Sequence, residues 1–212
     1  MIAGVDEAGR GCVIGPMVIT IAGIDKIDEF KMKELGVKDS KKLSAAQRER
    51  LFPEIEKICK LLVIKIPATE LNTLMDRLSL NEIEALKIGE GLNILGYSPS
   101  EAYIDSPDNI PKNFGIRIEK YLDKKVKLVC ENKADDKHLI VGAASIIAKV
   151  TRDREIEKIK KIVGYDFNSG YSSDPFTRGY LEKNLDDPKL APYLRTKWST
   201  LSDIKQRKLD EF

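Results

Sequence analysis

Cysteine and histidine are scarce in this chain, and their scarcity argues against several kinds of site. The 212 residues include three cysteines, Cys12, Cys59 and Cys130, and one histidine, His138. The cysteines form no C-x-x-C pair, so we expect no disulfide framework and a reducing, cytoplasmic setting. A zinc site would need ligands that the chain can barely supply.

Long apolar runs and a strong charge imbalance are also missing. No apolar segment approaches the roughly 20 residues that span a bilayer, so we expect a soluble protein with no membrane partner. The first residues already read as folded sequence, with no signal peptide. The net charge of +2 falls short of the strongly basic signature of a passive nucleic-acid binder. An enzyme that gathers carboxylates for metals and lysines for phosphates could show the same balance, so charge alone does not decide the function.

The periodicity of apolar residues predicts a mixed α/β fold. Antiparallel strands come first, strand and helix then alternate, and shorter helices follow from Tyr165 onward. Pro16 fits the first position of a strand. Ser44 is expected to be a helix N-cap, and Gly96 is expected to be a helix C-cap. We expect a strand that ends in a glycine-punctuated turn at residues 1–11, further strands at 15–24, 61–68, 101–106 and 126–132, and helices at 44–60, 79–96, after Pro111 and at 139–163.

Four acidic residues stand at the ends of expected strands or just before a helix. Asp6 and Glu7 end the first strand, Asp105 ends the strand 101–106, and Asp135 precedes the long helix. Such positions let side chains from distant segments of an α/β sheet converge. Oxygen ligands suit Mg²⁺ or Mn²⁺, and two such ions about 4 Å apart could hydrolyse a phosphodiester. Each acid alone fits an ordinary strand end or helix cap equally well, so spacing does not establish the site.

Asp6 and Glu7 raise a question of geometry. In a regular strand they point to opposite faces, because side chains alternate. Both can reach one metal centre only if the strand has ended by Glu7, or if Glu7 contributes its backbone carbonyl. The Ala8–Gly9 pair that follows could break the strand there.

Five motifs occur in a fixed order over about 170 residues, and together they resemble the ribonuclease HII (type 2 ribonuclease H) family, in an archaeal-like form. None of the five would be specific alone. They are GVDEAGRG at 4–11 with GPMV at 15–18, DSKKLS at 39–44, YIDS at 103–106, ENKAD at 131–135 followed by GAASIIAKVTRD at 142–153, and SGYSSDP at 169–175.

The resemblance implies an RNase H-like mixed five-stranded sheet flanked by helices, with a small helical C-terminal part. It implies a catalytic domain at 1–164, a helical part at 165–205 that contributes to the substrate cleft, and a tail at 206–212. The four acids, Asp6, Glu7, Asp105 and Asp135, would be both the catalytic residues and the metal ligands, with Mg²⁺ or Mn²⁺ as cofactor. The implied enzyme is a monomeric endoribonuclease. It cuts the RNA strand of RNA–DNA hybrids, and 5′ to ribonucleotides embedded in duplex DNA, by two-metal catalysis that leaves 3′-hydroxyl and 5′-phosphate ends.

The turn Gly9–Arg10–Gly11 matches the family element whose backbone senses the ribose 2′-hydroxyl. Glycines let backbone donors approach closely, and this hydroxyl distinguishes RNA from DNA. The alternative is a dinucleotide-binding loop, but Gly9, Gly11 and Gly15 give G-x-G-x-x-x-G, and a strand is expected where that loop requires a helix.

Other residues match substrate-binding positions of the family. Tyr171 matches the tyrosine that stacks on the sugar of the adjacent deoxynucleotide, although Ser172 follows it where many relatives have proline. Lysines at phosphate-contacting positions would make binding salt-sensitive, although lysine clusters also form ordinary solvated surfaces. These phosphate-contacting residues would be Ser40, Lys41, Lys42 and Lys149. We assign Trp198 and Phe176 to packing rather than to substrate binding.

The last residues carry a pattern of their own. Gln206, Leu209 and Phe212 have the spacing Q-x-x-L-x-x-F, which resembles the peptide by which replication proteins dock on the sliding clamp PCNA. A short helical turn would place Leu209 and Phe212 on one side, where they could fill an apolar pocket. The alternative is a frayed helix end with an incidental pattern.

Overall fold

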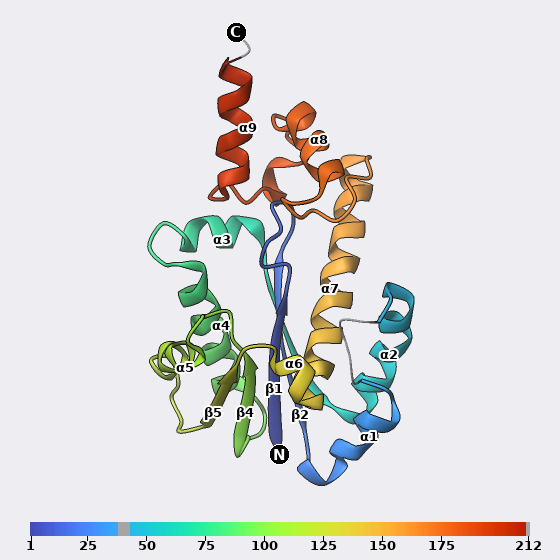
Figure 1. Ribbon diagram of the computed structural model, residues 1–212, viewed down its shortest axis with the longest axis vertical. Coiled ribbons are helices and arrows are strands. Elements are labelled where there is room, and N and C mark those ends of the chain that lie inside the picture. Colours follow the sequence, from blue (N-terminus) through green and yellow to red (C-terminus); the bar gives the residue numbers. More distant parts are fainter. Residues whose placement is uncertain (38–42, 211–212) are drawn as a thin grey trace. The chain divides into compact units, whose positions relative to one another are not determined.

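The computed structural model describes residues 1–37 and 43–210, and it divides into two compact units that are interleaved along the chain (Figure 1). The first unit consists of Met1–Ala8, Val18–Ile64 and Ser79–Thr151. The second consists of Gly9–Met17, Lys65–Leu78 and Arg152–Phe212. Within the described ranges, no helix is long and apolar enough to cross a membrane.

A five-stranded mixed sheet, in the order β3-β2-β1-β4-β5, organises the first unit. The central strand β1 pairs antiparallel with β2 and parallel with β4, and β4 pairs parallel with β5. This confirms the expected fold class. The strands are β1 (Ile2–Ala8), β2 (Met17–Ile24), β3 (Lys60–Ile66), β4 (Glu101–Asp105) and β5 (Lys127–Glu131).

Helices cover both faces of the sheet, which explains why β2 reads as a nearly continuous apolar run. Ala22 of β2 belongs to the core cluster with residues of α2 and α7, whereas Ile21 lies against Gly91 of α4 on the opposite face. Every residue of β2 is buried. The helices of this unit are α1 (Glu29–Glu34), α2 (Ala45–Ile58), α4 (Leu80–Ile94), α5 (Pro111–Glu119), α6 (Ala134–Lys137) and the first part of α7 (Leu139–Val163).

The start of α7 lies directly on the backbone of β1. A Cβ atom added at Gly4 would lie 2.4 Å from the carbonyl carbon of Ile140 and 2.5 Å from its oxygen. Only glycine permits an approach this close. Gly4 therefore sets the spacing between the central strand and the first turn of the long helix.

Local signals placed most helix ends correctly. Ser44 caps α2 through a reciprocal capping box with Gln47, and Pro16 directly precedes β2 as expected. The prediction for Gly96 was wrong: α4 ends at Ile94 with Leu95 as its C-cap, and Gly96 does not adopt a left-handed φ.

The second unit is mainly helical and has its own core. Buried side chains from residues 13–14, from the second half of α7 and from the C-terminal segments pack together in one cluster. Trp198 packs against this cluster as expected. Phe176 does not, because its side chain is 74% exposed at the start of α8. The helices here are α3 (Ala68–Leu74), the rest of α7, α8 (Pro175–Asn184), the 3₁₀ turn η3 (Ala191–Tyr193) and α9 (Ser199–Asp210).

Candidate active site

Three of the predicted acids lie at the ends of neighbouring elements in the first unit. β1 and β4 are parallel with Val5 opposite Ile104, so Asp6 and Asp105 follow at adjacent positions on neighbouring strands. The Asp105 carboxylate accepts a 2.8 Å hydrogen bond from the backbone amide of Ala134, the residue before Asp135. Asp6 and Asp135 are 5% and 4% exposed. The structure therefore places acids from β1, β4 and α6 at the same edge of the sheet.

The environment of Asp6 opposes its negative charge. Burial, above all, raises the pKa of Asp6 well above its ordinary value, and the carboxylates of Glu7 and Asp105 raise it further. The positive charge of Lys149 and a hydrogen bond with Ser145 act in the other direction. Lys149 in turn donates to the Ser145 hydroxyl. Sequence reasoning did not single out Ser145, although the residue lies inside a quoted motif.

Glu7 remains within the strand. β1 continues through Ala8, and Glu7 pairs with Ile19 of β2. The strand has therefore not ended by Glu7, and the side chains of Asp6 and Glu7 alternate between the faces. The first route considered from the sequence, a strand that has ended by Glu7, is therefore wrong, and the role of the Glu7 backbone carbonyl stays a prediction.

The acids do not form a closed metal cage. In the described part of the chain, no three His, Cys, Asp or Glu side chains lie close enough together to hold a metal ion. The residues do fit a divalent cation in their chemistry, because the donors are carboxylate oxygens and because like charges already crowd the buried Asp6. The assignment of all four acids as ligands stays a prediction.

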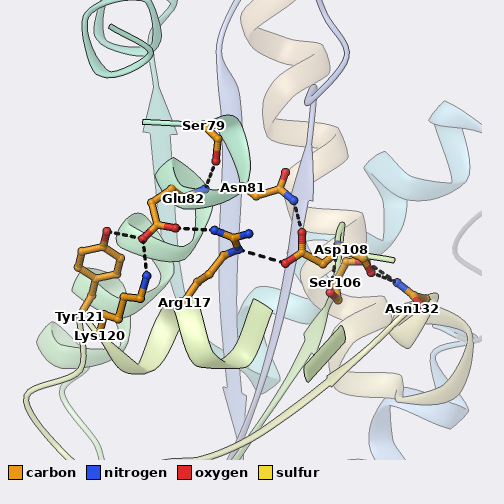
Figure 2. A network of polar contacts seen from close by, with 9 residues as sticks. All are labelled: Ser79, Asn81, Glu82, Ser106, Asp108, Arg117, Lys120, Tyr121 and Asn132. Atoms are coloured by element: carbon orange, nitrogen blue, oxygen red, sulfur yellow. Dashed lines mark hydrogen bonds and ion pairs between the residues drawn. The ribbon is translucent and has the colours of Figure 1, made fainter. Parts of the chain in front are cut away.

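The loops that follow β4 and β5 are tied together by side-chain hydrogen bonds, many of them drawn in Figure 2. The Asn132 side-chain amide donates to the carbonyl oxygens of Ser106 and Asp108, at 2.9 Å each. The Ser106 amide donates to the Glu131 carbonyl at 2.9 Å. Asn132 stands between Glu131 and Asp135 in the chain, and Ser106 follows Asp105. These bonds therefore fix the two segments that carry Asp105 and Asp135.

Arg117 of α5 extends this network toward α4 (Figure 2). Its guanidinium contacts Glu82 at 2.8 Å and Asp108 at 3.2 Å. The hydrogen bond from Arg117, followed by that from Tyr121, holds the pKa of Glu82 below its ordinary value. No periodic or motif signal pointed to Arg117, because its partners lie 9 and 35 positions away in the chain.

We expect Arg117→Met to weaken the protein by roughly 1 kcal/mol at neutral pH, a value reduced by solvent screening of the partly exposed pair. A carboxyl group with a lowered folded pKa stabilises the fold above its ordinary pKa of 4.5, and that contribution is lost as the pH falls. As the pH is lowered below 5, the free energy of unfolding should therefore fall less in the variant than in the parent. Urea titrations across this range measure the difference, and parallel pH curves for both proteins would contradict it.

The predicted ribose-sensing turn and the predicted stacking tyrosine lie side by side in the second unit. A Cβ atom added at Gly11 would lie 3.6 Å from the Tyr171 ring, and Cys12 forms an antiparallel bridge with Tyr171. Gly9 and Gly15 have φ values of +82° and +94°, which favour glycine. The strand β2 follows this turn, so the helix of a dinucleotide-binding loop is absent from residues 17–24.

An arginine side chain lies against the ring of Tyr171. The Arg152 guanidinium lies 4.9 Å from the ring centroid and donates to the Ser169 carbonyl at 3.1 Å. Such a cation–π contact restricts the orientation of the ring. Arg152 was not among the predicted site residues, although it is the last residue but one of the motif at 142–153.

The structure describes only some of the remaining predicted site residues. Gln206 and Leu209 belong to α9, and the Gln206 side chain is exposed. Lys149 lies on α7 close enough to Asp6 for its charge to act there. Ser40, Lys41, Lys42 and Phe212 lie outside the described residues.

Comparisons with known proteins agree with this fold. A family model described as Ribonuclease HII matches residues 3–201. Ribonuclease HII from Archaeoglobus fulgidus is 47% identical over 212 residues, which are 100% of both chains. A structure of the PCNA:RNase HII complex from the same organism aligns over 100% of each chain, with a TM-score of 0.88 and 44% identity. Ribonuclease H2 from Pyrococcus horikoshii aligns over 97% of each chain, with a TM-score of 0.86 and 44% identity.

The fold and these similarities define an endonuclease of the ribonuclease H class, which depends on divalent metal ions. Within that class the chain belongs to the ribonuclease HII family. The resemblance found in the sequence motifs is thereby confirmed.

Proposed function

We propose that this enzyme cuts the RNA strand of RNA–DNA hybrids and also cuts 5′ to single ribonucleotides embedded in duplex DNA. The observation that carries the proposal is the contact of Tyr171 with the Gly9–Gly11 turn. A backbone turn beside an aromatic ring can read one sugar by its 2′-hydroxyl while the ring packs on the next. A site that reads one sugar in this way requires only a single ribonucleotide in the substrate strand.

The carboxylates of Asp6, Asp105 and Asp135, with the Glu7 carbonyl, would hold two Mg²⁺ or Mn²⁺ ions. Such ions, when bound, activate a water molecule and stabilise the leaving oxygen, which gives 3′-hydroxyl and 5′-phosphate ends. The buried, crowded position of Asp6 supports this assignment, because cations would offset the repulsion that Asp6 meets there. Ser145 and Lys149 would orient the Asp6 carboxylate.

Phosphate binding is the role proposed for Ser40, Lys41 and Lys42, and Lys149 could add to the same positive potential. In this role each lysine neutralises backbone charge without reading the sequence. The enzyme would act as a cytoplasmic monomer in DNA replication and in the repair of misincorporated ribonucleotides.

The test is a cleavage assay on a duplex with one ribonucleotide in an otherwise DNA strand, in the presence of Mg²⁺ or Mn²⁺. We expect a single nick on the 5′ side of that ribonucleotide and no nick in the all-DNA duplex. Mapping the product ends identifies the bond that is cut. Cleavage only within longer RNA tracts would contradict the single-ribonucleotide proposal while leaving the hybrid activity in place.

We also propose that the tail binds the sliding clamp PCNA. The A. fulgidus relative has been solved in complex with PCNA and aligns with this chain over its full length. Here α9 extends to Asp210 and presents an exposed Gln206 at the first position of the Q-x-x-L-x-x-F pattern. Helical segments with this spacing insert apolar anchors into a groove of the partner.

Deletion of residues 206–212 should abolish binding to the clamp and spare intrinsic nuclease activity, because it removes none of the residues proposed to bind metal, ribose or phosphate. Surface binding to immobilised PCNA and the cleavage assay without PCNA measure the two effects. Lys205→Ala, which changes an exposed residue of α9 just before the pattern, is the matched control. Undiminished clamp affinity after the deletion would refute this role for the tail.

A further inference from the structure

Arg195 is a fully buried arginine with no acidic partner in the described part of the structure. Its side chain is 0% exposed. Nε donates to the Gly15 carbonyl at 2.9 Å and Nη1 donates to the Arg10 carbonyl at 3.0 Å. Nη2 is buried without a hydrogen-bond partner. Burying a guanidinium without a carboxylate is costly, so its presence here points to a role beyond packing.

The backbone around Arg195 fixes where the guanidinium lies. Ile14 and Leu194 form an antiparallel bridge, and the Arg195 amide donates to the Val13 carbonyl at 3.0 Å. The guanidinium carbon lies 4.8 Å from the centroid of the Trp198 ring. The planar guanidinium thus lies against an aromatic ring, with one donor directed at Arg10 in the turn and another at Gly15, four residues beyond Gly11.

We infer that Arg195 is a positioning residue for ribose recognition: its guanidinium orients the peptide between Arg10 and Gly11 in the turn proposed to sense the 2′-hydroxyl. This inference rests on the proposed function of that turn. Arg195 does not touch the substrate in this account. It acts through the backbone of the turn.

The orientation follows from the peptide bond itself. A trans peptide is planar, and its C=O and N–H point in opposite directions; the described residues contain no cis peptide bond. Because the Arg10 carbonyl points at Arg195, the Gly11 N–H points away from it. No backbone carbonyl of the described residues accepts a hydrogen bond from this N–H. A carbonyl that accepts from a cation also polarises its peptide, which makes the opposite N–H a stronger donor.

The charge on Arg195 persists under working conditions. Burial lowers the pKa of Arg195 to about 10, so the guanidinium stays protonated at neutral pH. The positive charge behind the turn therefore remains in place when the substrate binds. Lysine would keep the charge but, with a single nitrogen, could not reproduce the fork that engages Arg10 and Gly15 together.

The experiment compares the parent enzyme with Arg195→Lys and Arg195→Met. Two duplexes serve as probes, one with a single ribonucleotide and one of DNA only. Steady-state cleavage of the first gives kcat and KM, and binding to both in EDTA gives the preference for the ribonucleotide. We expect Arg195→Lys to lower kcat by roughly 10- to 100-fold through misplacement of the turn. The ratio of its affinity for the ribonucleotide duplex to its affinity for the DNA duplex should fall toward one, with little change in affinity for the DNA duplex.

Leu181→Ala is the control for general loosening, because Leu181 is fully buried in the core of the same unit and is not part of the turn. It should lower the melting temperature and keep the preference for the ribonucleotide. All assays are run below the melting transition of each variant. If Arg195→Met does not fold, Arg195→Lys alone decides the matter.

The outcomes separate the two proposals. A parent enzyme that fails to cut the single-ribonucleotide duplex overturns the proposed function. A parent that cuts it, together with an Arg195→Lys variant that keeps the parent's kcat and preference, overturns the positioning role of Arg195. The positioning role is also overturned if Arg195→Lys and Leu181→Ala show the same losses of kcat and of preference for the ribonucleotide duplex.

Discussion

Asp6→Asn is expected to reduce cleavage by roughly 1,000-fold or more, since it removes a charged oxygen ligand from the centre of the proposed metal site. The same change should leave the metal-free protein at least as stable as the parent. Asp6 is buried beside the carboxylates of Glu7 and Asp105, and a neutral side chain removes that repulsion. Catalytic sites commonly sacrifice stability for function in this way.

Cleavage rates and thermal unfolding in EDTA measure the two effects on Asp6→Asn. Asp123→Asn, at an exposed aspartate of the same unit, is the matched control and should change neither. Near-parental cleavage by Asp6→Asn would remove Asp6 from the catalytic site. A large fall in metal-free stability with lost activity would instead indicate that Asp6 holds the fold together.

Gly4→Ala is expected to have the largest effect on stability, about 3 kcal/mol or more, with a fall of roughly 10 °C in melting temperature. The new methyl group would lie 2.4 Å from the backbone of Ile140, which has no rotamer through which to move away. β1 and the first turn of α7 would have to separate. Because Asp6 follows Gly4 by two residues on β1, cleavage should fall as well, even at temperatures where the variant is folded.

Gly179→Ala is the control for this substitution. Gly179 lies inside α8, and a Cβ atom there would meet nothing within 4 Å. Alanine favours helix over glycine by up to about 1 kcal/mol, so this variant should be unchanged or slightly stabilised. Circular dichroism melts and cleavage assays on both variants are sufficient. Parental stability of Gly4→Ala would show that the strand and helix can move apart at little cost.

Most of the fold could be predicted because its signals are local. Ser44 and Gln47 form a capping box within four residues, and apolar periodicity outlined all five strands and the long helix. The short helices α1, α3 and α6, of four to seven residues, were missed. Segments of this length contain too few turns to display a period, and tertiary packing decides their form.

The four acids stood out first by their place at expected strand ends and before a helix, and only the motifs assigned them as metal ligands, which stays a prediction. The backbone register explains why Asp6 and Asp105 fall at adjacent strand positions. Ser145, Asn132 and Arg195 act through contacts with residues distant in the sequence, so no spacing rule could find them. The boundary predicted at residue 164 treats the units as consecutive and stays a prediction, whereas the units of the structure interleave.

The interleaving of the units has a consequence for the order of synthesis. Residues 9–17 leave the ribosome well before residues 170–195, yet they pair with Gly170, Tyr171 and the 193–195 segment of the same unit. At roughly 5–20 residues per second, this delay is about 10–40 s. The first unit, with all four acids, is complete at Thr151. A nascent chain would thus carry the four acids proposed to bind metal before it can form the turn proposed to sense the 2′-hydroxyl, on which the selection of ribonucleotides depends.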